Sequence, residues 1–292
     1  MPKLIKSFAL SLFSSLLLTG LIITPVISAQ DSEVLVDDTP FEKQYANYQA
    51  KFKQYDTLHQ EYVVKRSQYM RFKTLTSQED AYDATLAMLL ARNDVLVAYF
   101  QSLKEKLKEG EDIPDDAEAR LILTIDDEVG WLTTHQNQTS TAGTLDDLVT
   151  DSKTASSRFA NNQTIIAYES LAAFSLGRML GYERRTQDLY DDLKKKIDEV
   201  RSETREGYTF SAGKFQVLDR WMFDAETRIT RAKQKTTDAQ SFFSTKNIKS
   251  KGTEALNQYN NTLKTLGEAQ LFLKEANTFM SEVIRELKTA EN

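Results

Sequence analysis

The chain has 292 residues, of which 40% are hydrophobic and 27% charged, and its formal net charge is −6. This balance excludes an intrinsically disordered chain and a polytopic membrane protein. Cysteine is absent, which excludes disulfides, cysteine-ligated metals, a cysteine nucleophile and a lipid anchor on cysteine. The only histidines are His59 and His135, so histidine-rich metal sites and most histidine-based catalysis have little support.

Residues 1–29 have the pattern of a targeting segment. Lys3 and Lys6 form a basic start, residues 8–27 are almost continuously apolar, and Pro25 precedes two small residues. The pattern predicts a signal peptide. An uncleaved N-terminal membrane anchor is the alternative, because the apolar run approaches the roughly 20 residues of a membrane span. Either outcome predicts an extracytoplasmic protein, secreted or tethered to the membrane.

The remaining sequence favours long helices. Residues 30–38 form a short acidic linker, and without the two leader lysines the net charge is −8. From residue 30 onward there are only two prolines, Pro40 and Pro114, and nine glycines, too few breakers for a sheet protein. Helix-start signals, with capping residues, an early proline or early carboxylates, precede the periodic segments. They lie at Thr39, Thr76, Pro114 and Thr144. We therefore expect an all-α, elongated antiparallel bundle of about six long helices with coiled-coil-like seams.

The first helix carries a seam rich in aromatic residues at two heptad positions. One position holds Phe41, Tyr48, Tyr55, Tyr62 and Tyr69, and the other holds Tyr45, Phe52, His59, Arg66 and Lys73. We expect this seam to pack against the second helix. Stacking of exposed rings on envelope glycans is the alternative.

Later segments divide the chain further. The polar run 136–143 predicts an internal boundary, with one three-helix unit over 39–135 and another over 144–292. The long helix from Thr144 reaches about Glu206 and includes Gly177 and Gly181, where we expect a neighbouring helix to cross closely. The last two helices keep a 4-3 apolar rhythm, and a one-residue change of phase predicts a turn within 244–252. The rhythm of the first runs through Leu218, Met222, Ala225, Ile229, Ala232, Thr236, Ala239 and Phe243, and that of the second through Leu256, Tyr259, Leu263, Leu266, Gln270, Leu273, Asn277, Met280, Ile284 and Leu287.

No group of residues supports catalysis. A di-iron bundle needs two Glu-x-x-His pairs, and only Asp56 with His59 approximates one. The carboxylates of residues 111–128 lack the spacing of a calcium loop; acidity at a helix start explains several of them. We therefore expect no catalytic, cofactor-binding or metal-binding residues, no cofactor, and no enzyme.

The segment Tyr69–Gln78, together with Leu89–Asp94, resembles exported helical proteins of small-genome bacteria, a group without an established function. The resemblance covers about the first third of the chain after the leader and includes no catalytic motif. It implies an extracytoplasmic helical protein and implies nothing about activity.

The leading functional hypothesis is a non-enzymatic extracytoplasmic helical scaffold or adaptor. A ligand-sensing or cargo-binding bundle is the alternative, and a pore-forming helical protein is a weaker one.

Residues 228–251 carry a net charge of +6. This charge indicates contact with an anionic envelope component, an unknown protein, the membrane surface or another copy of the chain. A solvated surface without a partner is the other interpretation. Nucleic acid is a poor candidate partner. The basic residues are Arg228, Arg231, Lys233, Lys235, Lys246, Lys249 and Lys251.

Overall fold

A computed structural model describes residues 39–203, 210–244 and 252–289 of the chain. Met1–Asp38 and Thr39–Asn292 form separate units, and every described element belongs to the second. The predicted targeting segment and linker therefore lie outside the described residues. None of the described helices is long and apolar enough to cross a bilayer.

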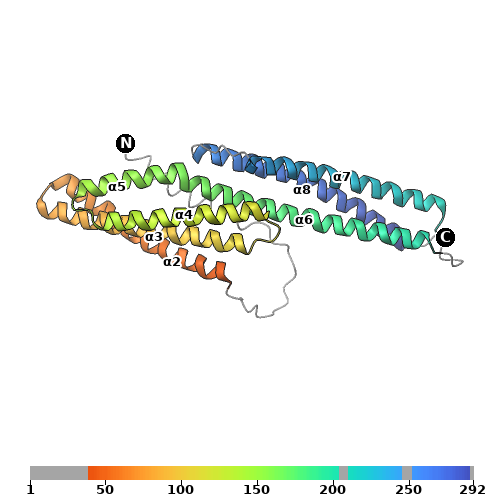
Figure 1. Ribbon diagram of the computed structural model, residues 1–292, viewed down its shortest axis with the longest axis horizontal. Coiled ribbons are helices and arrows are strands. Elements are labelled where there is room, and N and C mark those ends of the chain that lie inside the picture. The colour runs from red at the N-terminus through yellow and green to blue at the C-terminus, as the bar shows by residue number, and fades with distance from the viewer. Residues whose placement is uncertain (1–38, 204–209, 245–251, 290–292) are drawn as a thin grey trace. The chain divides into compact units, whose positions relative to one another are not determined.

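Every described element is helical (Figure 1), so the predicted all-α bundle is confirmed. The elements are α2 (Pro40–Phe72), α3 (Leu75–Lys108), α4 (Asp115–Ser140), α5 (Leu145–Arg158), the π-helical turn η1 (Phe159–Gln163), α6 (Thr164–Arg201), α7 (Ala212–Ser244) and α8 (Gly252–Lys288). Because α5, η1 and α6 follow one another without a break, the described residues form six long helical segments.

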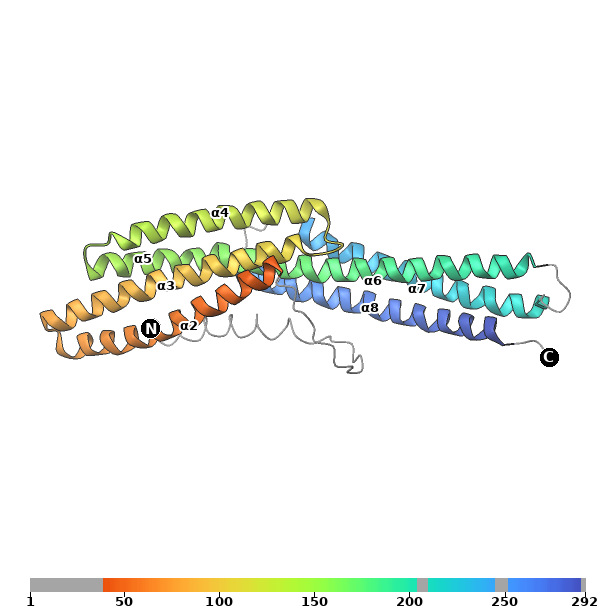
Figure 2. The same cartoon turned by 90° about the horizontal axis from the view of Figure 1, so that it is seen from below.

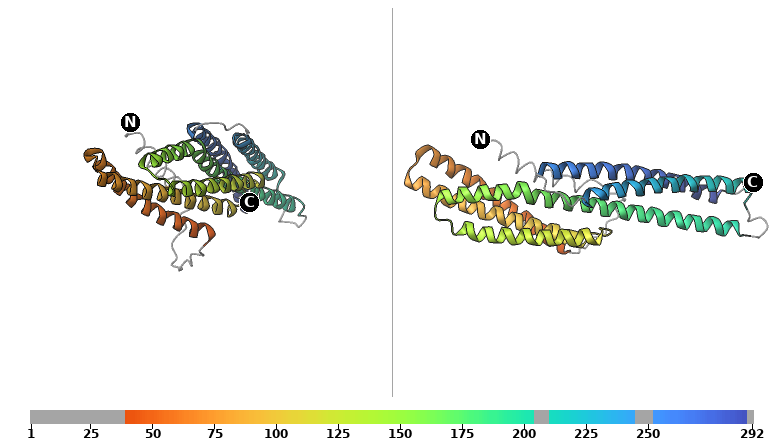
Figure 3. Two further views of the ribbon diagram at one scale, coloured as in Figure 1. Left: turned by 60° about the vertical axis from the view of Figure 1, so that its left-hand side comes forward. Right: turned by 45° about the horizontal axis from the view of Figure 1, so that its top comes forward.

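The helices change partners along the chain. Helix α2 packs along α3, as Figure 2 shows, and α4 contacts α3 as well. Helix α5 contacts α3, whereas α6 packs mainly against α7 and α8. The same neighbours lie side by side in both views of Figure 3. The change of partner between α5 and α6 falls at the π turn.

Local capping chemistry sets several helix starts. Thr39 and Thr144 each form a reciprocal capping box, as the sequence predicts. The second helix begins earlier than predicted: Thr74, and not Thr76, is its N-cap, and its hydroxyl accepts from the Ser77 amide. The predicted start therefore missed the true box by two residues.

The third helix is longer than predicted. Helix α4 continues through the polar run to Ser140, because the side chains of His135 and Thr139 are buried on the inner face of the bundle. The turn to α5 is consequently only residues 141–144. The division into units 39–135 and 144–292 stays a prediction, and Thr39–Asn292 forms one compact unit.

The predicted seams differ in how deeply they are buried. On α7, the predicted residues from Leu218 to Ala239 are all buried. On α8, Leu266, Leu273 and Met280 are buried as predicted. The alternate positions of its seam, however, lie one residue earlier than predicted, where small side chains allow close packing. These are Thr262, Ala269, Ala276 and Val283. Phe243 lies outside the residues whose side chains are described.

The glycines of α6 meet a loop instead of the predicted crossing helix. A Cβ on Gly177 would lie 2.8 Å from Ile113 Cγ1, and one on Gly181 would lie 2.5 Å from Asp112 Oδ2. Both contacts belong to the loop between α3 and α4. The glycines therefore make room for a loop, and a side chain at either position would push that loop away.

The aromatic seam of α2 is half-buried, with Tyr48 fully buried. Tyr55 and Tyr62 pack against Met88 and Leu89 of α3 and Leu148 of α5. Burial raises the pKa of the Tyr55 hydroxyl, since it disfavours the phenolate. These contacts support packing over glycan stacking for the two rings.

We expect Tyr55→Ala and Tyr62→Ala each to lower the free energy of unfolding by about 2–4 kcal/mol, because each removes a ring packed against this cluster. Urea denaturation measures the loss. A Leu271→Ala control, at a side chain 61% exposed, should change stability by less than about 0.5 kcal/mol. Wild-type stability of both tyrosine variants would contradict the packing assignment.

Candidate functional site: a buried polar network at the π turn

A buried carboxylate lies at the centre of the main polar cluster. Glu128 of α4 is 1% exposed. The Nε and Nη2 atoms of Arg158 donate to its Oε2 over 3.0 and 2.7 Å, and Gln163 Nε2 donates to its Oε1 over 2.8 Å. A buried carboxylate needs such partners, because its desolvation is otherwise very unfavourable. Glu128 therefore ties α4 to both ends of η1.

The π turn is what lets both partners reach the same carboxylate. In an α-helix, residues five apart differ by about 140° around the axis. A π turn closes hydrogen bonds between residues five apart, which places Arg158 and Gln163 nearly above one another. Consistent with this geometry, the Thr164 amide donates to the Phe159 carbonyl, and the Thr164 hydroxyl donates to the same oxygen over 2.8 Å.

An aromatic stack extends the cluster along α4. The Arg158 guanidinium lies 5.0 Å from the centre of the Trp131 ring, and Trp131 stacks on His135 with ring centres 4.8 Å apart. Asn93 Nδ2 of α3 lies 3.3 Å from His135 Nδ1. Nδ1 accepts from this amide when the imidazole proton lies on Nε2. We call these six residues the Glu128 network: Asn93, Glu128, Trp131, His135, Arg158 and Gln163.

Several polar atoms in and beside the network have no partner among the described residues. They include Arg92 Nε and Nη2, Asn93 Oδ1, Thr139 Oγ1 and Gln163 Oε1, all buried. Burial lowers the pKa of Arg92, and the nearby Tyr55 and Tyr62 oppose that shift. The set combines guanidinium donors of Arg92 with amide acceptors of Asn93 and Gln163, so internal water, which both donates and accepts, would satisfy it. The network thus combines a closed ion pair with buried polar atoms that lack a partner among the described residues.

Metal binding has little support from these contacts. Glu128 is already engaged by Arg158 and Gln163, and no group of three or more potential metal-ligating residues occurs in the described part of the chain. His59, the other histidine, lies on α2 between Tyr55 and Tyr62, with ring centres 5.6 and 6.0 Å away. The two histidines thus belong to separate aromatic groups.

The structure describes four of the seven predicted basic contact residues, and each interacts with a neighbouring helix. Arg228 pairs with Glu275 of α8 over 3.0 Å, and Lys235 pairs with Glu268 over 2.6 Å. Lys233 donates to Gln187 of α6 over 2.9 Å. Arg231 lies 6.0 Å from the Phe272 ring centre. Their charges therefore help to hold α7 to its neighbours. Lys246, Lys249 and Lys251 lie outside the described residues, so an anionic contact along this segment stays a prediction.

Sequence reasoning missed the Glu128 network. Glu128 is one of several carboxylates in residues 111–128, and its heptad position gave the one usable signal: it lies one helical turn from Ile125 and Leu132 on a predicted apolar face. No such signal marks Gln163 or Arg158 in the sequence, because these two residues share a helix face only across the π turn.

No protein-family model, no curated protein and no solved structure matches the chain. The resemblance of the Tyr69–Gln78 segment to exported helical proteins therefore stays a prediction.

The two single substitutions that break the Arg158–Glu128 ion pair should lower the free energy of unfolding by different amounts. Arg158→Met leaves the Glu128 carboxylate buried with only Gln163, and we expect a loss of about 3–5 kcal/mol. Glu128→Gln leaves Arg158, whose side chain is 31% exposed and can reach water, so about 1–3 kcal/mol is expected. Urea denaturation compares the two. An equal or smaller cost for Arg158→Met would contradict this account of the burial.

The His135 environment predicts a loss of stability in mild acid. Burial lowers the pKa of His135 from its ordinary value of 6.5, Arg92 lowers it further, and Asp151 opposes both. Just below pH 6.5 the unfolded chain therefore binds more protons than the folded protein, and the stability contribution of neutral His135 is lost as pH falls. Urea midpoints at pH 7.5 and 5.5 measure the effect. His135→Gln should flatten this pH dependence whereas His59→Gln should not; equal slopes in the two variants would refute it.

Proposed function

We propose that the protein is a non-enzymatic extracytoplasmic helical scaffold or adaptor that mediates cell-envelope or protein–protein interaction. The observation that carries the proposal is how the helices fill the space between them. Leucine, methionine and alanine side chains from α6, α7 and α8 form continuous buried clusters, and aromatic rings fill the α2–α3 seam. Filled seams suit a protein that presents outer surfaces.

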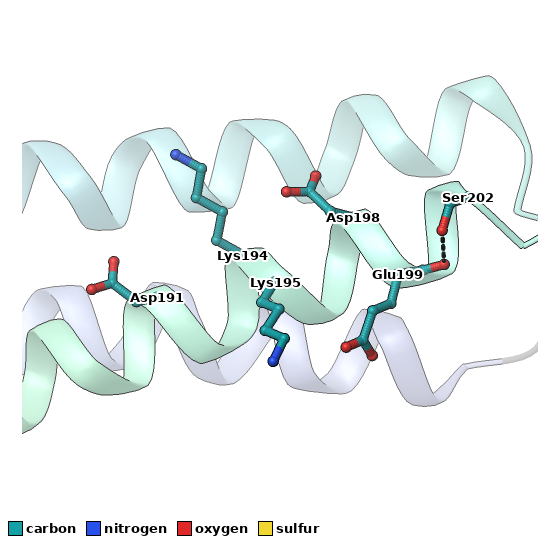
Figure 4. A pocket seen from close by; sticks show the side chains of 6 residues that line it. All are labelled: Asp191, Lys194, Lys195, Asp198, Glu199 and Ser202. Atoms are coloured by element: carbon teal, nitrogen blue, oxygen red, sulfur yellow. Dashed lines mark hydrogen bonds between the residues drawn. The ribbon is translucent and has the colours of Figure 1, made fainter.

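The described hollows support the same proposal. One lies along the C-terminal half of α6 (Figure 4), where the Ser202 hydroxyl donates to the Glu199 carbonyl. A second lies along the first half of α4. Each is lined by residues of a single helical segment, the first mainly by charged side chains and the second by charged and apolar side chains in equal number. Neither therefore has the converging walls of a small-molecule site. The α6 hollow is lined by Asp191, Lys194, Lys195, Asp198, Glu199 and Ser202.

The extracytoplasmic part of the proposal is supported by the sequence of residues 1–29, with its basic start and apolar run. Such a segment directs export whether or not it is cleaved.

A ligand-binding bundle is the second candidate, and one observation favours it. The unpartnered guanidinium donors Nε and Nη2 of Arg92 lie buried between helices, a place where bundles hold ligands. A small carboxylate would match these donors.

Site-specific photocrosslinking in intact cells tests the scaffold proposal. A photoreactive residue at Phe223 or Leu271, which are 67% and 61% exposed, should give a discrete adduct with a second protein or envelope polymer. The same residue at Leu218 or Leu273, both fully buried, should give none. Absence of adducts at the exposed positions, with a stoichiometric small molecule retained in native mass spectra, would favour the ligand-binding bundle instead.

A further inference from the structure

Three large apolar side chains are exposed at the turn between α2 and α3. Met70 is 61% exposed, Phe72 59% and Leu75 71%. They fall within six residues, around the turn that joins α2 to α3 at one end of this hairpin (Figures 1 and 2). The same two helices bury Tyr48 and Leu89 elsewhere along their seam. Exposed apolar groups gathered in this way mark a surface that binds something. We call residues 66–75 the α2–α3 tip.

The tip is also cationic. No acidic residue occurs between Glu61 and Glu79, whereas Lys65, Arg66, Arg71 and Lys73 do. Lys65 pairs with Asp80 over 2.8 Å. Among the described residues the other three basic side chains form no ion pair, and all three are exposed. The acidic chain thus has a net positive surface at this turn, interleaved with the apolar side chains.

Lys73 adds a backbone observation. It adopts the left-handed conformation, with φ of 51°, at the C-terminal cap of α2. Glycine is the usual residue there, because a Cβ is unfavourable in that conformation. Lys73 therefore contributes a positive charge but strains the backbone. A Lys73→Gly substitution would remove the charge and relieve the strain together.

We propose that the α2–α3 tip docks on an anionic lipid surface. Met70, Phe72 and Leu75 enter the boundary between head groups and acyl chains, and Arg66, Arg71 and Lys73 bind head-group phosphates. The combination of apolar and basic side chains is the one that binds peripheral segments to anionic bilayers. A projecting turn needs no complementary groove when its partner is a soft, flat bilayer. The proposal goes beyond the scaffold function and does not rest on it.

The absence of cysteine allows a site-specific test in the full chain. Leu75→Cys, labelled with an environment-sensitive fluorophore, should brighten on phosphatidylglycerol vesicles and much less on phosphatidylcholine vesicles. Brightening should weaken at about 0.5 M salt, where the Debye length falls to a few ångströms. The matched control is Leu271→Cys, another exposed leucine, which should stay unchanged. This control separates docking of the tip from insertion of residues 1–29.

Two further variants separate binding from folding. In the labelled background, Lys73→Gly should weaken lipid affinity about fivefold, because one cation near an anionic surface is lost, while its unfolding midpoint stays the same or rises. Met70→Ser with Phe72→Ser should reduce affinity at least about tenfold. The proposal is overturned if the position-75 label does not respond to anionic vesicles, if both labels respond equally, or if Lys73→Gly binds like wild type.

Discussion

The requirement to compensate one buried carboxylate shapes the middle of this helical bundle. Glu128 is almost completely removed from water, and a bare carboxylate there would destabilise the fold by several kcal/mol. Its partners come from consecutive turns of the next helical segment, Arg158 and Gln163. They can reach it together only because the chain makes a π turn between them. The π turn therefore brings both partners to Glu128, and the buried carboxylate in turn favours the irregular backbone.

The same point is where the long helix changes neighbours. Before the π turn, α5 places Leu148 against Met88 and Leu89 of α3. After it, α6 contributes Leu176 and Met179 to a cluster with α7 and α8. An uninterrupted α-helix keeps one apolar stripe at a nearly constant angle, whereas an extra residue in one turn rotates the following stripe. The Glu128 network thus stabilises the junction at which one set of packing partners gives way to another.

The features that the sequence predicted well are those decided locally. Thr39 and Thr144 cap helices through residues three positions away, and the seam of α7 from Leu218 to Ala239 follows a simple period. A local rule also failed where two sites competed: Thr76 and Glu79 match a capping box, yet Thr74 and Ser77 form it. Only the Thr76 pattern has the glutamate of the usual capping box, so the pattern alone selects the wrong threonine, and the preceding turn decides the helix start.

The other differences depend on tertiary packing. The buried positions of α8 include Ala269 and Ala276, because close approach of α7 favours small side chains, whereas a search for large apolar residues selects their neighbours. For Glu128 the sequence offers only its position one helical turn from Ile125 and Leu132, which places it on the apolar face but does not reveal its partners. Of the predicted basic contact residues, Arg228 and Lys235 pair with α8, which a charge count cannot foresee. Charge composition identifies a region, but the pairing decides how much of that charge faces a partner.

Native-state hydrogen exchange tests the link between Glu128 and the π turn most directly. The Thr164 amide donates across that turn, and the Leu273 amide, within α8, serves as the reference. If Glu128 holds the turn, Glu128→Gln should speed exchange at Thr164 by clearly more than at Leu273, because the turn opens locally. An equal change at both amides would mean that the π turn forms independently of the buried carboxylate, which contradicts the account.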